Sequence, residues 1–125
     1  MNLNQVTIPS TNLEKSVAFY TTLGLRLIVD SIPRYARFEC PDGTTTLSLH
    51  HVEKLPKGPG ITIYFEDEHL DEWFKILQQK GLVFSLPPTN QPWLWCEAHL
   101  QDPDGHQIIL YQAGKNRKNP PWRIN

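Results

Sequence analysis

The chain has 125 residues, of which 39% are hydrophobic and 20% charged, and its formal net charge is −1. This size and composition predict one compact globular domain, and a net charge near zero gives no global field that would attract nucleic acid or an anionic membrane. No apolar run is long enough to cross a bilayer and the start of the sequence is polar, so we expect a cytoplasmic protein with no nucleic-acid and no membrane partner.

The first half of the chain predicts a strand, a helix and three more strands. Residues 5–8 alternate as a strand, and polar cap candidates at residues 10–12 precede apolar residues at helical spacing. Gly24 is expected to end this helix. The three following strands are predicted at residues 25–29, 35–40 and 44–50.

The second half of the chain repeats this order. A strand is predicted at residues 61–65, and a helix at residues 67–80 is followed by Gly81. Strands should follow at residues 82–86, 93–101 and 106–112. The sequence therefore predicts an α+β fold built from a duplicated unit.

We expect a single domain over residues 1–125 with four consecutive parts. The first module covers about 3–52, a linker rich in proline, glycine and lysine covers about 53–60, the second module covers about 61–112, and a tail covers 113–125. The basic tail is expected to be extended, with Trp122 packed on the body or on a partner, and a frayed end is the open alternative. Cys40 and Cys96 are isolated and predict neither a disulfide nor a metal knuckle.

Two segments carry a family resemblance. Asn12-Leu13-Glu14-Lys15-Ser16-Val17-Ala18-Phe19-Tyr20, followed by Leu23-Gly24-Leu25, and the turn Asp102-Pro103-Asp104-Gly105 resemble the vicinal oxygen chelate superfamily of glyoxalase I, bleomycin resistance proteins and extradiol dioxygenases. The resemblance implies two βαβββ modules whose mixed sheets curve into a cup, with the helices on the outer face. It also implies a homodimer. Members share a fold and differ in chemistry.

Strand alternation divides the residues between the two faces of each sheet. The set expected under the helices is apolar: Val6, Ile8, Ala36, Phe38, Cys40, Leu47, Leu49, Ile61, Ile63, Phe65, Ala98, Leu100, Ile108 and Leu110. The set expected to line the cup is mostly polar or aromatic: Gln5, Thr7, Tyr35, Arg37, Glu39, Thr46, Ser48, His50, Thr62, Tyr64, Trp95, Glu97, His99, Gln107, Ile109 and Tyr111.

The resemblance also implies where a divalent metal would be bound, one ligand on each of four strands. In this chain those positions are Gln5, Ser48, either Gly60 or Thr62, and Ile109. Only Gln5 offers a plausible donor, and an isoleucine cannot bind a metal. We therefore expect no metal at this site and no cofactor, and without that Lewis acid the usual glyoxalase chemistry should fail.

Two alternatives stay open. A relocated site with His50, His99 and one carboxylate, Glu97 or Glu39, could hold a divalent metal such as Ni, Zn, Fe or Mn. Without a metal, His50, Glu97 and His99 could act as acid–base catalysts. Either version would make the protein a glyoxalase-like lyase, an isomerase or a dioxygenase. The remaining histidines, His51, His69 and His106, are expected in exposed turns or edges.

Trp93 and Trp95 lie two residues apart in the predicted strand 93–101, so both side chains should share one face and offer a wall for a planar or cationic ligand. A cover for a hydrophobic edge or a dimer contact is the alternative. We predict a metal-independent small-molecule binding protein, similar to the bleomycin resistance proteins. Its ligand-binding residues should be Gln5, Thr7, Arg37, Ser48, His50, Trp93, Trp95, Glu97, His99, Ile109 and Tyr111.

Overall fold

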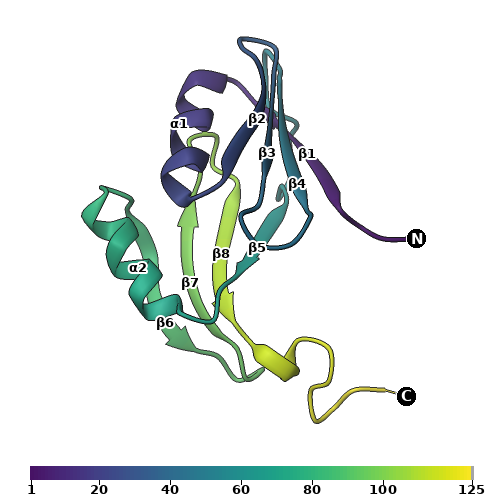
Figure 1. The fold of residues 1–125 in the computed structure, drawn as a ribbon, viewed down its shortest axis with the longest axis vertical. Coiled ribbons are helices and arrows are strands. Elements are labelled where there is room, and N and C mark those ends of the chain that lie inside the picture. The colour runs from purple at the N-terminus through teal and green to yellow at the C-terminus, as the bar shows by residue number, and fades with distance from the viewer. Residues whose placement is uncertain (125) are drawn as a thin grey trace. The chain divides into compact units, whose positions relative to one another are not determined.

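The computed structural model describes residues 1–124, which form two compact units (Figure 1). Unit 1 consists of Met1–Gly60 together with Asp102–Gly105, and unit 2 consists of Ile61–Gln101 and the chain from His106 onward. Each unit has one α-helix and a four-stranded mixed sheet, so the predicted α+β class and the two βαβββ modules are confirmed. None of the helices in residues 1–124 is long and apolar enough to span a membrane.

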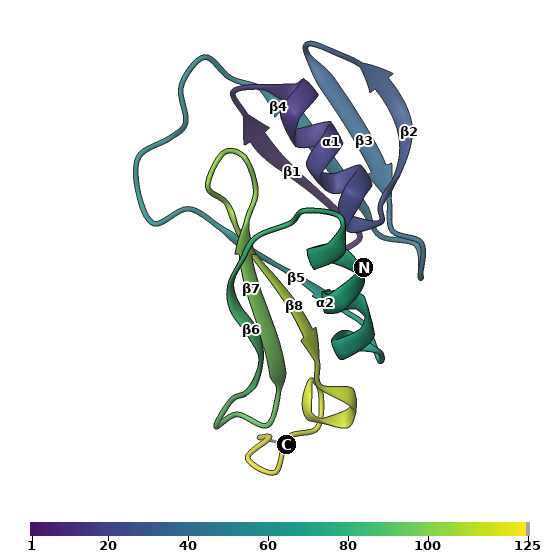
Figure 2. The ribbon, with the colours of Figure 1, turned by 90° about the vertical axis from the view of Figure 1, so that its left-hand side faces the viewer.

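The sheet of unit 1 has the strand order β1-β4-β3-β2. The outer strand β1 is parallel to β4, whereas β4, β3 and β2 are antiparallel neighbours. Figure 2 shows α1 against one face of this sheet. The elements in chain order are β1 Gln5–Ser10, α1 Leu13–Leu23, β2 Arg26–Ser31, β3 Tyr35–Glu39 and β4 Thr46–His51.

Helix α1 begins and ends at the residues that the sequence predicts. The side chain of Asn12 accepts a hydrogen bond from the backbone N–H of Lys15, which satisfies one of the free donors in the first turn. At the other end Gly24 has φ of 121°, and the N–H of Leu25 donates to the carbonyl of Tyr20 at 3.0 Å. This is a Schellman ending, in which glycine takes the left-handed conformation without a steric penalty.

The core of unit 1 lies between α1 and its sheet. Tyr20 and Phe38 are both fully buried, with ring centroids 6.0 Å apart. Strand alternation brings the aliphatic side chains of β1, β3 and β4 to the same face. The other buried apolar residues of this core are Ile8, Leu13, Leu23, Leu25, Ala36, Leu47 and Leu49.

Unit 2 repeats the arrangement with the strand order β5-β8-β7-β6, and β5 is parallel to β8. Its core is smaller and includes the edge-to-face pair of Phe74 and Phe84, whose ring centroids are 4.7 Å apart. The buried apolar residues here are Leu70, Leu77, Ala98, Leu100, Ile108 and Leu110. The elements are β5 Thr62–Glu66, α2 Leu70–Gln79, β6 Phe84–Asn90, β7 Cys96–Gln101, β8 Gln107–Gln112 and the 3₁₀-helix η1 Gly114–Asn116.

The prediction of a strand over residues 93–101 is wrong at its start, because β7 begins only at Cys96. Leu94 donates its backbone N–H to the carbonyl of Gln91 at 3.0 Å, which closes a tight turn with Pro92 at its second position. Leu94 then takes φ of 70°, and Gln91 pairs with Trp95 across the hairpin. Trp93 therefore lies in the turn, and it does not share a strand face with Trp95.

Other boundaries also differ from the prediction. β6 continues through Pro87 and Pro88, which an edge strand tolerates because it needs no donor on its open side. Ile61 is exposed because it precedes β5, and His106 is buried where an exposed turn was expected. The tail is not extended over its whole length, since it begins with η1 and continues in turns. The boundaries of the predicted helix 67–80 and of the strands 25–29, 44–50 and 82–86 differ from the observed ones by a few residues. Cys40, which was expected in the core, is only half-buried.

The turn Asp102–Gly105 belongs to unit 1 although it connects β7 to β8. The carboxylate of Asp104 accepts hydrogen bonds from the backbone N–H and the hydroxyl of Thr11, at 2.9 and 2.6 Å, and from the hydroxyl of Ser16 at 3.1 Å. The buried hydroxyl of Tyr20 donates to Asp102 at 2.6 Å. Both acids of the turn therefore bind to α1 and the residues just before it.

Burial and the contacts of this turn shift the pKa of Tyr20 and that of Asp104. Burial, followed by the charge of Asp102, raises the pKa of Tyr20, so its hydroxyl stays a donor. Partial burial acts to raise the pKa of Asp104, but the hydrogen bonds from Thr11, Ser10 and Ser16 outweigh it and the pKa is lowered. The ionised form of Asp104 is therefore bound more tightly in the folded chain than in the unfolded chain.

We expect Asp104→Ala to lower the free energy of unfolding by about 2 kcal/mol near neutral pH, because three donors lose a charged acceptor. The folded pKa of Asp104 is lowered, so this contribution is present above the unfolded value and disappears as the pH falls through the folded one. The difference between wild type and variant should thus shrink below about pH 4. Chemical denaturation at several pH values measures it.

The matched control is Asp42→Ala. Asp42 holds the same place in the Pro41-Asp42-Gly43 turn of the first half, but it is exposed, and among residues 1–124 no hydrogen bond to its side chain is described. Asp42→Ala should therefore change stability by less than about 0.5 kcal/mol. Equal losses from both substitutions would contradict the role of Asp104.

Candidate functional site

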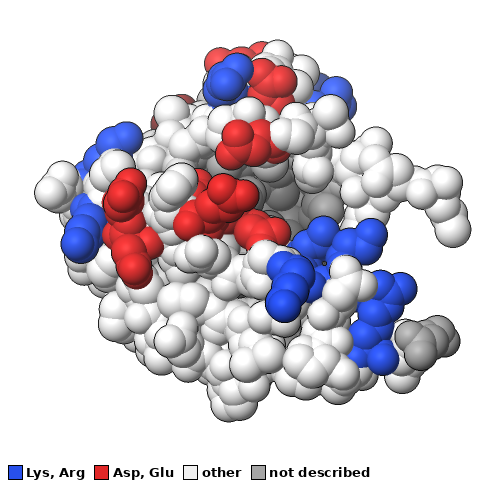
Figure 3. Space-filling model, turned by 60° about the horizontal axis from the view of Figure 1, so that its bottom comes forward, with Lys and Arg blue, Asp and Glu red and all other residues white. Residues whose placement is uncertain are grey.

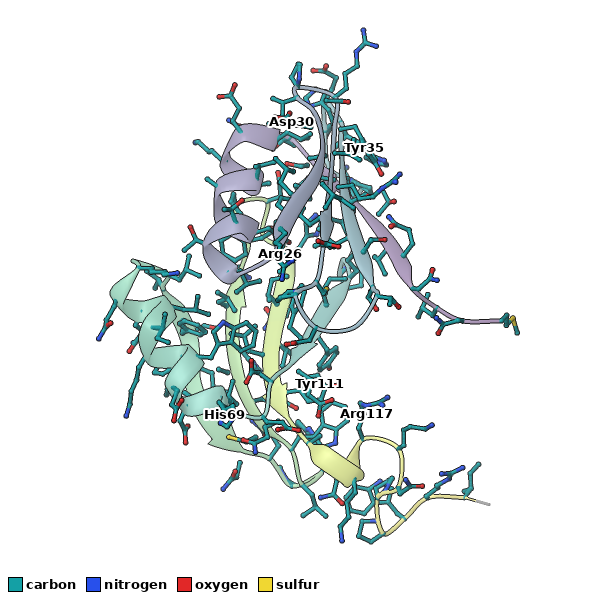
Figure 4. All side chains as sticks on the ribbon, in the orientation of Figure 1. Arg26, Asp30, Tyr35, His69, Tyr111 and Arg117 are labelled. Atoms are coloured by element: carbon teal, nitrogen blue, oxygen red, sulfur yellow. The ribbon has the colours of Figure 1, made fainter. Side chains whose placement is uncertain are left out.

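Each sheet has one face covered by its helix and one face that carries the predicted site residues. In unit 1, Ala36 and Phe38 are fully buried on the helix side, so alternation turns Tyr35 and Arg37 to the other face. In unit 2, Ile109 and Tyr111 belong to a cluster with Trp95, separate from the core under α2. Figure 4 shows Tyr35 and Tyr111 on the sides of their sheets away from the helices.

A hydrogen-bond network on the open face of unit 1 is centred on Ser48. This residue is 0% exposed, so it lies beneath the surface that it was expected to line. Gln5 Nε2 donates to Ser48 Oγ at 2.8 Å, and Ser48 Oγ shares a 2.6 Å hydrogen bond with Tyr35 Oη. The network therefore links β1, β4 and β3 across the open face.

Arg37 extends this network to the surface. Its Nε donates to Tyr35 Oη at 2.8 Å, and the guanidinium carbon lies 5.5 Å from the centroid of the Tyr35 ring. Desolvation acts to raise the pKa of Tyr35, but the hydrogen bonds with Ser48 and Arg37 and the positive charge of Arg37 lower it. The phenol oxygen is thus prepared to carry negative charge.

The other predicted residues of unit 1 surround this network without joining its centre. Thr7 is opposite Ser48 in the β1–β4 register, and His50 is opposite Tyr35 in the β4–β3 register. Both are exposed. Thr46 donates its hydroxyl to the side-chain carbonyl of Gln5, which orients the amide so that its nitrogen faces Ser48.

The open face of unit 2 contains a buried carboxylate. Glu97 is 2% exposed, and its two oxygens have different partners. The indole N–H of Trp93 donates to Oε2 at 2.6 Å, and Nε2 of His99 is 2.8 Å from Oε1. Trp93 thus reaches Glu97 from the hairpin turn, which the predicted strand did not foresee.

Next to this carboxylate lies a cluster of three aromatic rings. Trp95 and Tyr111 are stacked with centroids 4.6 Å apart and an interplanar angle of 18°. Tyr64 meets both edge-on, at 5.9 and 5.7 Å, and is itself 49% exposed. Ile109, on the same strand as Tyr111, is only 6% exposed and belongs to this cluster, so an apolar base supports the rings.

Sequence reasoning missed Glu66 and its contacts with the tail. One oxygen of Glu66 accepts from the backbone N–H groups of Ala113 and Gly114, and the other lies 3.7 Å from Nε of Arg117. The indole N–H of Trp95 donates to the carbonyl of Asn116 at 3.2 Å. The start of the tail is therefore fastened to the aromatic cluster. Figure 3 shows Lys and Arg side chains gathered beside the end of the described chain.

The family's metal-ligand positions do not form a donor set in this chain. Ser48 is buried and already bonded to Gln5 and Tyr35, and Ile109 is apolar. Thr62 is in β5 whereas Gly60 precedes it, and the residue opposite Ile109 is Tyr64. Across residues 1–124, no group of three or more His, Cys, Asp or Glu side chains could hold a metal ion. These residues do not fit a divalent cation.

Comparison with known proteins gives a consistent result. The family model described as the Glyoxalase/Bleomycin resistance protein/Dioxygenase superfamily matches residues 2–110. Among the curated proteins, none matches.

Solved structures with similar folds include a glyoxalase/bleomycin resistance protein/dioxygenase from Nocardioides, with a TM-score of 0.78 at 23% identity, covering 100% of this chain and 90% of the other. A member of the same superfamily from Sphaerobacter thermophilus DSM 20745 has a TM-score of 0.70 at 28% identity, with 90% and 97% covered. The bleomycin resistance determinant encoded on transposon Tn5 has a TM-score of 0.76 at 20% identity, with 91% and 99% covered.

We expect Glu97→Ala to lower the free energy of unfolding by about 2–3 kcal/mol, because it leaves the Trp93 indole and His99 without their acceptor. Glu97→Gln should cost less, since the amide keeps one acceptor oxygen. Thermal and urea denaturation measure the loss. The matched control is Glu53→Ala, since Glu53 also pairs with a histidine two residues away, His51, but its side chain is 96% exposed. A loss at Glu53 as large as that at Glu97 would refute the role of burial.

We expect Tyr35 to titrate below an ordinary tyrosine and Tyr111 above it. Burial and then the charge of Glu66 raise the pKa of Tyr111, although Arg117 opposes the shift. Removing the guanidinium with Arg37→Gln should raise the pKa of Tyr35 and leave that of Tyr111 unchanged. Carbon-13 NMR of the tyrosine Cζ atoms during a pH titration measures both. An unchanged Tyr35 titration in Arg37→Gln would contradict the described network.

Proposed function

Because the chain belongs to the Glyoxalase/Bleomycin resistance protein/Dioxygenase superfamily, we propose that it binds a small organic molecule without a metal ion. The ligand lies against the open face of unit 2, where the aromatic cluster of Tyr64, Trp95 and Tyr111 meets the pair of Glu97 and His99. Ile109 and Ser48 support the absence of a metal, since an isoleucine cannot bind a metal ion and a serine hydroxyl is a poor ligand at the positions that the family resemblance implies. A homodimer stays a prediction from the family alone.

The observation that carries this proposal is the aromatic cluster itself. Tyr111 is only 6% exposed and Trp95 is half-buried, so the ligand meets the cluster at Tyr64 and at the accessible part of Trp95, where a planar ring gains buried area and favourable ring geometry. Tyr64 and Trp93 remain 49% and 45% exposed, so apolar ring surface is available to solvent.

Glu97 contributes to this site by positioning its neighbours. Both of its oxygens are already bonded and the residue is 2% exposed, so a ligand contacts Trp93 and His99 instead. The carboxylate sets the direction of the indole ring and of the imidazole, which reduces the entropy that these side chains lose when a ligand binds. A ligand with a cationic group would gain a further attraction to the face of an aromatic ring.

A second candidate function is acid–base catalysis by His99. The 2.8 Å contact between Glu97 Oε1 and His99 Nε2 orients the imidazole, and a histidine oriented by a carboxylate is a common arrangement for proton transfer. The side chain of His99 is 25% exposed, so a substrate could reach it. This version would make the protein a lyase, an isomerase or a dioxygenase relative.

We expect planar aromatic compounds, including those with a cationic group and bleomycin among them, to raise the melting temperature in the presence of excess EDTA. Trp95→Ala should weaken binding of any hit by at least about tenfold, because the stacked surface is lost. Thermal shift and tryptophan fluorescence measure the two effects. The matched control is Trp122→Ala, since Trp122 is an exposed tryptophan of the tail with no ring contact.

Stabilisation by divalent metal ions together with an absence of aromatic hits would sink the proposal. Equal weakening by Trp95→Ala and Trp122→Ala would remove the site from the aromatic cluster. Turnover of a bound compound that is lost in His99→Gln, while binding is kept, would favour the catalytic version.

A further inference from the structure

A separate feature of unit 1 is the unbalanced positive charge of Arg37. It is exposed on the open face of the sheet, and no ion pair is formed by its guanidinium in residues 1–124. The nearest acidic side chain on its own strand, Glu39, is paired with Arg26 at 3.6 Å. The other side chains of the network, Gln5 and Ser48, are neutral. Arg37 therefore brings to the open face a positive charge that no ion pair of the described residues balances.

The guanidinium is held in place by the network beneath it. Nε is used in the 2.8 Å hydrogen bond to Tyr35 Oη, and Tyr35 is in turn held by the buried hydroxyl of Ser48 and, through it, by Gln5. Within residues 1–124 the only hydrogen bond described for the guanidinium is the one at Nε, so Nη1 and Nη2 are open to a ligand. This hydrogen bond already restricts the Arg37 side chain in the free protein. A ligand that binds it therefore causes a smaller loss of side-chain entropy than it would at a mobile arginine.

We propose that Arg37 forms a binding site for a small oxyanion, a carboxylate or a phosphate, on the open face of unit 1. The two terminal nitrogens of a fixed guanidinium match the spacing of two oxyanion oxygens, so a bidentate contact forms with both. Exposed Thr7 and His50, opposite Ser48 and Tyr35 in the strand registers, flank this position and add polar groups.

The protonation state of Tyr35 controls how strongly Arg37 binds an anion. Its oxygen accepts from Arg37 Nε, so any negative charge on the phenol competes with the anion for the same guanidinium. A neutral phenol leaves the full charge of Arg37 to the ligand, and the hydrogen bond with Ser48 gives the phenol proton an acceptor. Anion affinity should therefore be lost in alkaline solution, where Tyr35 ionises.

The test is a titration of the full chain with sodium phosphate and, separately, with sodium acetate, at constant ionic strength made up with chloride. The backbone amide signals of residues 35–37 and 48 should shift and saturate, with a dissociation constant of about 10 mM, as expected for one charge-assisted bidentate contact. Saturation with phosphate alone or with acetate alone identifies the preferred oxyanion, and either result supports the site.

Arg37→Gln should weaken the binding at least tenfold, and Arg37→Lys should weaken it as well, since an ammonium group cannot make the bidentate contact. Tyr35→Phe tests the fixing of the guanidinium and should weaken binding severalfold with the charge unchanged. The matched control is Arg34→Gln, since Arg34 is an exposed arginine three positions away whose side chain has no described contact. Shifts that do not saturate, or equal weakening by Arg34→Gln, would overturn the proposal. Trp95→Ala should leave anion binding intact, which separates this test from that of the proposed function.

Discussion

The carboxylates of Asp102 and Asp104 bind residues of unit 1 that lie more than 80 positions earlier in the sequence. Four hydrogen bonds join them to Thr11, Ser16 and Tyr20, and one of these satisfies a phenol that is fully buried. The turn that carries both acids also connects β7 to β8. The segment between β7 and β8, the two strands that carry Glu97, His99, Ile109 and Tyr111, therefore belongs to unit 1.

Buried polar groups play the same part on both open faces. In unit 1 the hydroxyl of Ser48 lies under Tyr35 and Gln5, and in unit 2 the carboxylate of Glu97 lies behind Trp93 and His99. Each of these buried groups is hydrogen-bonded. A buried polar atom without a partner would destabilise the fold by more than a typical hydrogen bond stabilises it. Each also fixes side chains that remain accessible. The residues that a ligand can touch are thus oriented by residues that it cannot touch.

The tail illustrates how contacts from a terminal segment complete a site. Glu66 ends β5 and binds the backbone of Ala113 and Gly114, and Trp95 binds the carbonyl of Asn116. Trp95, which is held to the tail in this way, is stacked on Tyr111, and both rings belong to a cluster with Ile109. The basic side chains that follow, Lys115, Arg117 and Lys118, are exposed. The tail therefore contacts the aromatic cluster at Trp95, while Tyr64 of the same cluster stays exposed.

The sequence by itself determined the class of fold, the duplicated order of elements and the division of most strand residues between two faces, because these depend on local periodicity and on capping residues such as Asn12 and Gly24. The family resemblance of the sequence also implied that Ile109 occupies a position where a relative would bind a metal, and this stays a prediction. Only the tertiary structure decided which polar residues became buried centres, since Ser48 and Glu97 alternate like their exposed neighbours and differ only in what packs over them. The turn at Leu94, the return of Asp104 to α1 and the contacts of Glu66 with the tail were equally beyond the sequence, because each depends on partners distant along the chain or on a backbone conformation that leucine rarely adopts.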